Sequence, residues 1–134
     1  MVDAWKWKFY GFESLLEGRP VQEWFNNLPA DHKDEIVYLL LQLQSATASK
    51  WRRPEFDPLK AAGGISEIII RDIRDWAGVA YYRMYGYFGP GEHEYTFLHA
   101  IDKDVKNDIE GKRIAKERLD KIEREEARVH EFNF

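Results

Sequence analysis

The chain has 134 residues, of which 44% are apolar and 15% aromatic, and its formal net charge is −4. This length suits one domain, whose core buries roughly two-thirds of the surface of the unfolded chain. The lack of cysteine excludes disulfides and thiolate metal sites, and the acidic balance argues against a general polyanion binder, because phosphate contacts need clustered Lys and Arg. Since no apolar segment has the length of a signal peptide core or a membrane span, we expect a cytoplasmic protein that does not associate with membranes.

The N-terminal region predicts a strand followed by a short helix. Residues 5–12 alternate aromatic with polar side chains, which is typical of a strand with one solvent-exposed face. Gly18 and Pro20 interrupt this pattern, and Pro20 suits the first turn of a helix. The sequence Leu28-Pro29 ends that helix. Its apolar side chains at helical spacing are Val21, Trp24, Phe25 and Leu28.

A second helix follows directly, with Asp31 as its predicted N-cap. Its apolar stripe consists of Ile36, Leu39, Leu40 and Leu43. The two helices therefore form a hairpin, and we expect Trp24 and Leu40 to anchor the core. Residues 45–60 have no periodicity and contain two prolines, which predicts a loop.

The second half of the chain predicts three strands and a closing helix. The strand candidates are residues 65–72, 77–88 and 93–101, and their short connections favour antiparallel neighbours. A charged helix follows at residues 105–128, and no element is assigned to the tail at 129–134. The sequence thus predicts a single α+β domain at 1–128, with a small antiparallel sheet, the N-terminal helix hairpin packed on one face, and a C-terminal helix.

Side-chain alternation divides the predicted strands into two faces. The mostly apolar set suits the face beneath the helices and comprises Ile68, Ile70, Ala80, Tyr82, Met84, Thr96, Leu98 and Ala100. The opposite set is aromatic and ionisable and comprises Glu67, Arg71, Tyr81, Arg83, Tyr85, Tyr95, Phe97 and His99.

Two interpretations of the ionisable set stay open. It indicates an RNA-binding groove, because bases stack on tyrosine and arginine binds phosphate bidentately. A purely structural role is the alternative, in which Arg83 pairs with Glu67 across the sheet and His99 is a half-buried histidine with satisfied hydrogen bonds. The four histidines are too scattered to indicate a metal site, and no phosphate-binding glycine loop is present, so we expect neither a metal nor another cofactor.

Five motifs, taken in order, resemble blocks of the phage-derived, HigB-like branch of the RelE/HigB toxin superfamily. The likeness covers about residues 5–122. The motifs are the aromatic strand with Gly18-Arg19-Pro20-Val21 and the helix ending in Leu28-Pro29; Gly64-Ile65-Ser66-Glu67-Ile68; Tyr82-Arg83; Phe97-Leu98-His99-Ala100-Ile101 with Lys103; and Ala115 with Arg118.

This resemblance implies a RelE-like fold and a metal-independent mRNA endoribonuclease that acts at the ribosome and is neutralised by a helix-turn-helix antitoxin. The RNA 2′-hydroxyl would attack the adjacent phosphate. The resemblance assigns catalysis to Arg83, His99 and Lys103, which would hold phosphate, transfer a proton and supply charge. It assigns RNA binding to Arg71, Tyr81 and Tyr85, with Arg71 on phosphate and a tyrosine on a base.

Two positions depart from the family pattern. Ile69 stands where the family has an arginine, and Asp104 stands where it has the second of two lysines. Arg71, two residues after Ile69, shares its strand parity and is a candidate replacement, whereas a carboxylate at 104 repels phosphate. These departures leave two rival interpretations: a catalytically degraded toxin-like binding protein of phage origin that retains the fold and partner binding, and a phage accessory protein that binds a host protein.

Overall fold

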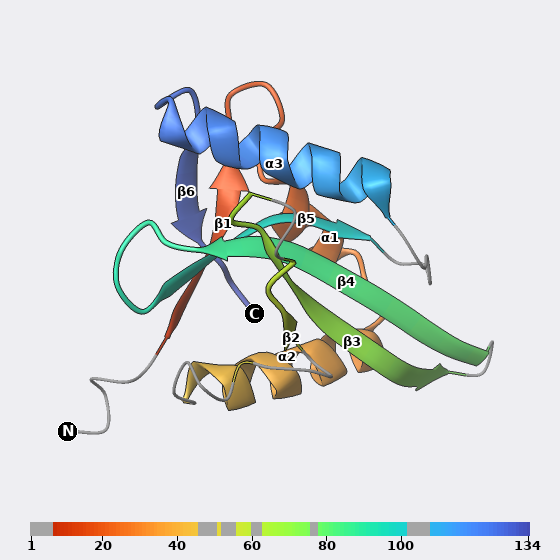
Figure 1. Cartoon of the computed structure of the whole chain (residues 1–134). Coiled ribbons are helices and arrows are strands. Elements are labelled where there is room, and N and C mark those ends of the chain that lie inside the picture. Colours follow the sequence, from red (N-terminus) through yellow and green to blue (C-terminus); the bar gives the residue numbers. More distant parts are fainter. Residues whose placement is uncertain (1–6, 46–50, 52–55, 60–62, 76–77, 102–107) are drawn as a thin grey trace.

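The computed structural model describes residues 7–45, 51, 56–59, 63–75, 78–101 and 108–134, and of residues 71–75 and 78–81 the backbone alone. Two helices follow the first strand and one follows the fifth (Figure 1). The elements are β1 (Lys8–Glu13), α1 (Pro20–Asn26), α2 (Ala30–Gln44), β2 (Phe56–Asp57), β3 (Ser66–Asp75), β4 (Gly78–Phe88), β5 (Glu94–Ile101), α3 (Ile109–Glu123) and β6 (Arg128–Glu131).

Within the described ranges, six strands form one sheet in the spatial order β2-β3-β4-β5-β1-β6. Strand β1 runs parallel to β5, and every other neighbouring pair is antiparallel. The predicted N-terminal strand therefore lies in the same sheet as β3, and the α+β fold class is confirmed. Because β1 lies between β5 and β6, the first and last strands of the chain are neighbours.

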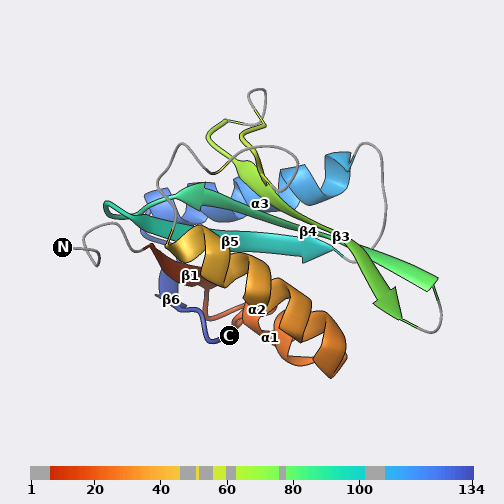
Figure 2. The ribbon, with the colours of Figure 1, turned by 90° about the horizontal axis from the view of Figure 1, so that it is seen from below.

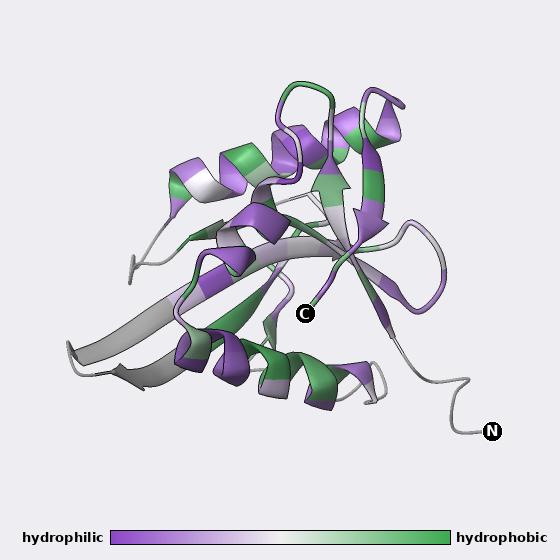
Figure 3. Ribbon diagram, turned by 180° about the vertical axis from the view of Figure 1, so that it is seen from behind, coloured by the Kyte–Doolittle hydropathy of each residue, from purple (hydrophilic) through white to green (hydrophobic). Residues whose placement is uncertain are grey.

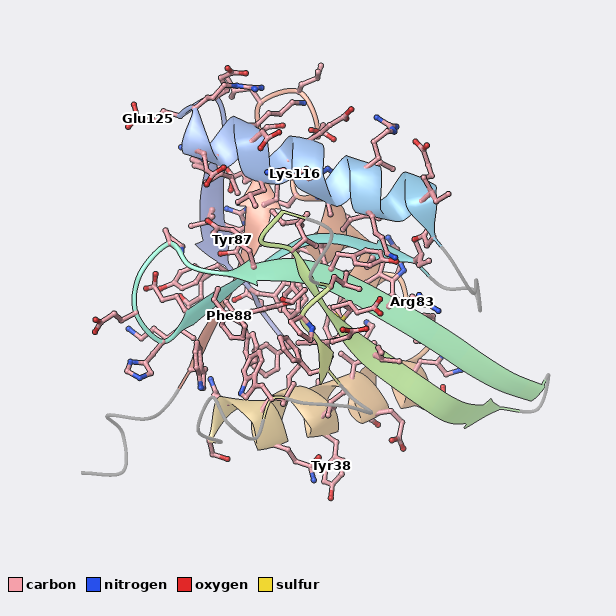
Figure 4. All side chains as sticks on the ribbon, viewed as in Figure 1. Tyr38, Arg83, Tyr87, Phe88, Lys116 and Glu125 are labelled. Atoms are coloured by element: carbon pink, nitrogen blue, oxygen red, sulfur yellow. The ribbon has the colours of Figure 1, made fainter. Side chains whose placement is uncertain are left out.

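Helices cover both faces of the sheet. Helices α1 and α2 pack on one face, as predicted for the hairpin, and α3 packs on the other (Figure 2). Neighbouring residues of β4 show the two sides, because Tyr87 points toward α3 and Phe88 toward α2 (Figure 4). We call the core beneath α1 and α2 the hairpin core, and the smaller core beneath α3 the α3 core. The α3 core contains Phe12, Ile65, Tyr85, Leu98, Ala115 and Leu119.

A β-bulge in β5 changes the face that its side chains occupy. Tyr85 pairs with His99, but Gly86 pairs with Phe97, so Leu98 is the extra residue. Because side chains alternate with a period of two, one extra residue reverses the alternation beyond it. The part of β5 before the bulge is thus turned over relative to the prediction. The predicted faces are wrong for Tyr95, Thr96, Phe97 and Leu98.

The helices begin at only some of the predicted positions. Helix α1 begins at Pro20 as predicted, but α2 begins at Ala30 with Pro29 as its N-cap, so Asp31 is not the cap. Helix α3 begins at Ile109, four residues later than predicted, because Asp108 accepts a hydrogen bond from the backbone N–H of Gly111 and caps it. None of the described helices has both the length and the apolar content needed to span a bilayer.

The segments without predicted elements contribute to the sheet and the core. Strand β2 lies in the predicted loop at 45–60 and pairs with β3, and β6 lies largely in the tail and pairs with β1. Phe132 is buried in the hairpin core. The Gln22 amide holds Asn133 by two hydrogen bonds of 2.8 Å each, because Nε2 donates to the carbonyl oxygen and Oε1 accepts from the backbone N–H.

The two predicted core anchors differ in burial. Leu40 is fully buried in the hairpin core. Trp24 is only partly buried and packs at the margin, while the neighbouring Phe25 occupies the buried position. Trp24 and Phe25 both fit the helical spacing of apolar residues in α1. The prediction of Trp24 as an anchor was therefore wrong by one residue, because the helix turns Phe25 and not Trp24 toward the core.

Candidate functional site

Arg83 of β4 forms an ion pair with Glu67 of β3 inside the protein. The Arg83 Nη1 atom lies 3.7 Å from the Glu67 Oε2 atom, and the side chains are 10% and 4% exposed. Ile69 stands opposite Arg83 in the strand register and is buried. The side chain of Ile69 is apolar, so it brings no positive charge to this position. The carboxylate of Glu67 balances the charge of Arg83.

Tyr85 lies two residues further along β4 and links the sheet to the start of α3. Its side chain is fully buried, and its hydroxyl donates a hydrogen bond of 2.9 Å to Oδ2 of Asp108. Oδ1 of Asp108 accepts from the backbone N–H of Gly111 over 3.0 Å. Burial first, and then the Asp108 carboxylate, raise the pKa of Tyr85, so the phenol is protonated and serves as a donor.

Asp108 is a site residue that the sequence interpretation missed. The signal was present, because aspartate is a preferred N-cap and this one lies three residues before the amide that it accepts from. Placing the helix start at residue 105 puts Asp108 inside the helix, where its capping role is not apparent. The carboxylate both satisfies a free amide of α3 and positions the Tyr85 hydroxyl.

His99 of β5 stacks beside Tyr85 and contacts Arg118 of α3. The two ring centroids are 6.3 Å apart with an interplanar angle of 2°. Arg118 Nη1 lies 3.3 Å from Nδ1 of His99, and the same atom donates to the Leu98 carbonyl oxygen over 2.8 Å. Burial first, and then the Arg118 charge, lower the pKa of His99 to about 4. At neutral pH His99 is therefore uncharged, with Nδ1 accepting from Arg118 and the ring proton on Nε2.

Arg118 is itself held in place by the turn between β1 and α1. Its Nε and Nη2 atoms donate to Oε1 of Glu17 over 3.1 and 2.9 Å, and its guanidinium lies 5.4 Å from the centroid of the Phe12 ring. Lys121 of α3 donates to the other Glu17 oxygen over 3.3 Å. Arg118 thus joins α3, the bulge of β5 and the first turn of the chain, and its charge is directed at His99.

Residues 23–126 match the family described as phage-derived protein Gp49-like (DUF891). The chain belongs to the Gp49-like family. This is a RelE/HigB-like toxin family, which confirms the resemblance at the level of the superfamily. No curated protein and no solved structure matches the chain.

The structure of this Gp49-like chain brings together three of the six predicted site residues. Arg83, Tyr85 and His99 lie in neighbouring strands, on the face covered by α3. Of Arg71 and Tyr81 only the backbone is described, in β3 and β4. The β3–β4 pairing has a register shift between Ile70 and Ile73, in the part of β3 that contains Arg71.

The predicted site residue Lys103 and the neighbouring Asp104, which departs from the family pattern, lie outside the described residues. The resemblance between residues 115–118 and the last family helix has a structural counterpart, because Ala115 is a fully buried residue of α3 in the α3 core and Arg118 reaches β5. Within the part of the Gp49-like chain that the structure describes, no three His, Cys, Asp or Glu side chains are grouped so that they could hold a metal ion.

Proposed function

We propose that this Gp49-like chain is a toxin-like protein of a toxin–antitoxin pair that cleaves mRNA without a metal ion. The observation that carries the proposal is the placement of Arg83, Tyr85 and His99 on one face of the neighbouring strands β4 and β5, where Tyr85 contacts Asp108 and His99 contacts Arg118. Family membership supports the toxin-like part. The helix-turn-helix antitoxin and the ribosome belong to the proposal as partners, because the resemblance implies both.

In the proposed reaction the 2′-hydroxyl of the RNA loses its proton to water as its oxygen forms a bond to the adjacent phosphorus, and the bond to the 5′-oxygen breaks as that oxygen takes a proton from water, which leaves a 2′,3′-cyclic phosphate and a 5′-hydroxyl. Arg83 would hold the phosphate once its guanidinium exchanges the Glu67 carboxylate for a phosphate oxygen. His99 is neutral, so its Nε2–H would stabilise charge on the phosphate by hydrogen bonding and would not act as a strong acid. Lys103 would add a second positive charge.

The closed state of the site favours a second candidate function, a toxin-like binding protein that does not cleave RNA. Arg83 is balanced by Glu67, and the Tyr85 hydroxyl is used by Asp108. A base can stack on Tyr85 only if the start of α3 moves away, because the tyrosine is fully buried. Each of these interactions lowers the affinity of the site for RNA and leaves the fold intact.

A cleavage assay with ribosomes programmed with mRNA distinguishes the nuclease from the binding protein. The wild type should cleave, and a variant without the Arg83 charge should lose about 10²–10³ in rate. Because Arg83→Met alone leaves the Glu67 carboxylate buried without its cation, the variant is Arg83→Met with Glu67→Gln, which keeps the site neutral. Arg113→Gln is the matched control, since Arg113 is an exposed arginine paired with Glu110 and Glu117.

Other results of the cleavage and binding assays would support the binding protein or contradict the nuclease proposal. A wild type that binds ribosomes or an antitoxin but leaves mRNA intact supports the binding protein. Gain of cleavage by Ile69→Arg with Asp104→Lys would then place the loss of activity at the two positions that depart from the family pattern. A wild type that binds neither RNA nor ribosomes and causes no growth arrest on induction would contradict the nuclease proposal.

A further inference from the structure

The turn between β1 and α1 exposes two adjacent leucines. The relative exposure is 104% for Leu15 and 89% for Leu16, so neither side chain packs against the protein. Figure 3 shows the apolar colour at the outer end of this turn, which stands clear of the neighbouring ribbon. Two exposed large apolar side chains add nothing to the core, and clustered apolar exposure of this kind marks interaction sites in proteins.

The turn is rigid, so the leucines are presented in a fixed position. Ser14 and Gly18 exchange two backbone hydrogen bonds of 3.0 and 2.9 Å, and the backbone N–H of Glu17 donates to the Ser14 hydroxyl over 2.9 Å. The Glu17 carboxylate is held by Arg118 and Lys121 of α3. A partner that binds here pays little conformational entropy on this side of the interface.

A groove of about 280 Å³ lies directly beside Leu15, where the turn meets the connection from α3 to β6. Its lining residues are Glu13, Ser14, Leu15, Glu125, Glu126, Ala127 and Arg128. The groove therefore has an apolar wall at Leu15 and Ala127 and a rim that carries three carboxylates and one guanidinium. Figure 4 shows Glu125 at the opposite end of α3 from Arg83, so the groove is separate from the candidate nuclease site.

The charged groups on the rim of the groove indicate which charge a partner's side chain should carry. Glu13 is already paired with Arg19 and Arg128, and Glu126 with Arg124. Glu125 forms no ion pair with any residue in the described part of the chain, so its carboxylate can accept an ammonium or guanidinium group from outside. The carboxylates of Glu13, Glu125 and Glu126 are equal in number to the guanidinium groups of Arg19, Arg124 and Arg128, so the rim has no net charge, and the group that favours a cationic partner is the carboxylate of Glu125.

The groove lies where β1 ends and β6 begins, because Glu13 and Arg128 are paired in the sheet and both line it. A segment bound in the groove would place an aliphatic side chain against Leu15 and Ala127 and a basic side chain near Glu125.

We propose that Leu15, Leu16 and the adjoining groove, with the carboxylate of Glu125 on its rim, form a docking surface for a partner protein, which inserts a segment carrying an aliphatic residue flanked by Lys or Arg. The surface lies at the far end of α3 from Arg83 and His99. The inference does not depend on RNA cleavage, and binding can be measured with a protein that has no nuclease activity.

The probe for this surface is a displayed library of random ten-residue peptides, selected on the full chain. Selected peptides should share an aliphatic residue next to Lys or Arg, and Leu15→Ser with Leu16→Ser should weaken their binding at least tenfold. Glu125→Lys with Glu126→Lys should weaken it similarly. Leu41→Ser is the matched control, because Leu41 is an exposed leucine of α2 that lies outside the groove.

Unchanged denaturation midpoints for all three variants would show that they fold, which their surface positions predict. The proposal fails if no peptide is selected at the leucines, or if charge reversal at Glu125 and Glu126 leaves binding unchanged. Self-association that depends on Leu15 and Leu16, measured by sedimentation, would assign the surface to a second copy and overturn the proposal. Leucine-dependent binding to vesicles of anionic phospholipid would overturn it too.

Discussion

The guanidinium of Arg118 donates a hydrogen bond of 2.8 Å to the carbonyl oxygen of Leu98, the extra residue of the β5 bulge. A bulge leaves the strand ladder locally interrupted, and here a side chain from α3 supplies a donor at that position. The same guanidinium lies against His99 and is held by Glu17. One arginine therefore satisfies the irregular backbone and adds to the effect of burial in lowering the pKa of the neighbouring histidine.

Removing the Arg118 charge should raise the pKa of His99. Arg118→Gln eliminates the cation that lowers this pKa, while the burial of the ring remains, so the value should rise from about 4 but stay below that of an exposed histidine. The measurement is an NMR titration of the His99 ring. Lys116→Gln is the control, because Lys116 is an exposed cation of the same helix that pairs with Asp120. Equal His99 titrations in both variants would show that Arg118 does not set the protonation state.

Protein stability should decrease as the pH falls from about 6.5 toward 4. His99 and His130 both have lowered pKa values in the folded protein, mainly because of burial. Between the folded and unfolded pKa values the unfolded chain binds more protons, so acid favours unfolding. The free energy of unfolding from urea titrations across this range is the measurement, and His99→Gln should flatten its pH dependence. A flat wild-type profile above pH 4.5 would contradict the assignment.

Gly111→Ala should destabilise the protein, although alanine in a helix is normally more favourable than glycine by about 1 kcal/mol. A Cβ atom at Gly111 would collide with Oδ2 of Asp108. The carboxylate would have to leave its place, which removes the α3 cap and the acceptor for Tyr85. Losing such a cap costs about 0.5–2 kcal/mol. Urea denaturation tests the sign of the change, and Lys112→Ala, one position along the helix, should be close to neutral.

Leu40→Ala should lower the free energy of unfolding by about 2–5 kcal/mol, because Leu40 is fully buried in the hairpin core. The adjacent Leu41→Ala is the matched control: it removes the same atoms from a side chain that is 51% exposed, so its cost should stay within about 0.5 kcal/mol. Chemical denaturation of both variants measures the difference. Equal costs would show that the face of α2 is misassigned.

The C-terminal residues should contribute to stability as core residues do. Phe132→Ala should cost about 3–5 kcal/mol, since the ring is buried between Phe25 and Phe97. Phe134→Ala removes the same ring from a position that is 38% exposed, so its effect should be clearly smaller. Thermal or urea unfolding of the two variants distinguishes a structural C-terminus from a dispensable one.

Local patterns explain how much of this structure could be predicted. The strand at β1, the start of α1 at Pro20 and the burial of Leu40 follow from side-chain periodicity and from proline, which act over a few residues. The pairing of Arg83 with Glu67 also follows, because both lie on one face of neighbouring antiparallel strands. The prediction that Trp24 is a buried anchor was wrong and the capping role of Asp108 was missed, because each depends on where a helix begins or how it is rotated on the sheet.

The sequence by itself determined most element types, the α+β class and the likeness to RelE/HigB toxins, because these depend on short-range patterns and ordered motifs, but it did not reveal the short edge strands β2 and β6. Only the tertiary structure decided which face each residue of β5 occupies, since one extra residue at Leu98 reverses a period-two alternation. It also decided that α3 covers Tyr85. That packing rests on contacts of Arg118 with Glu17 and Leu98, which are distant in sequence, and such contacts leave no periodic signal in the chain.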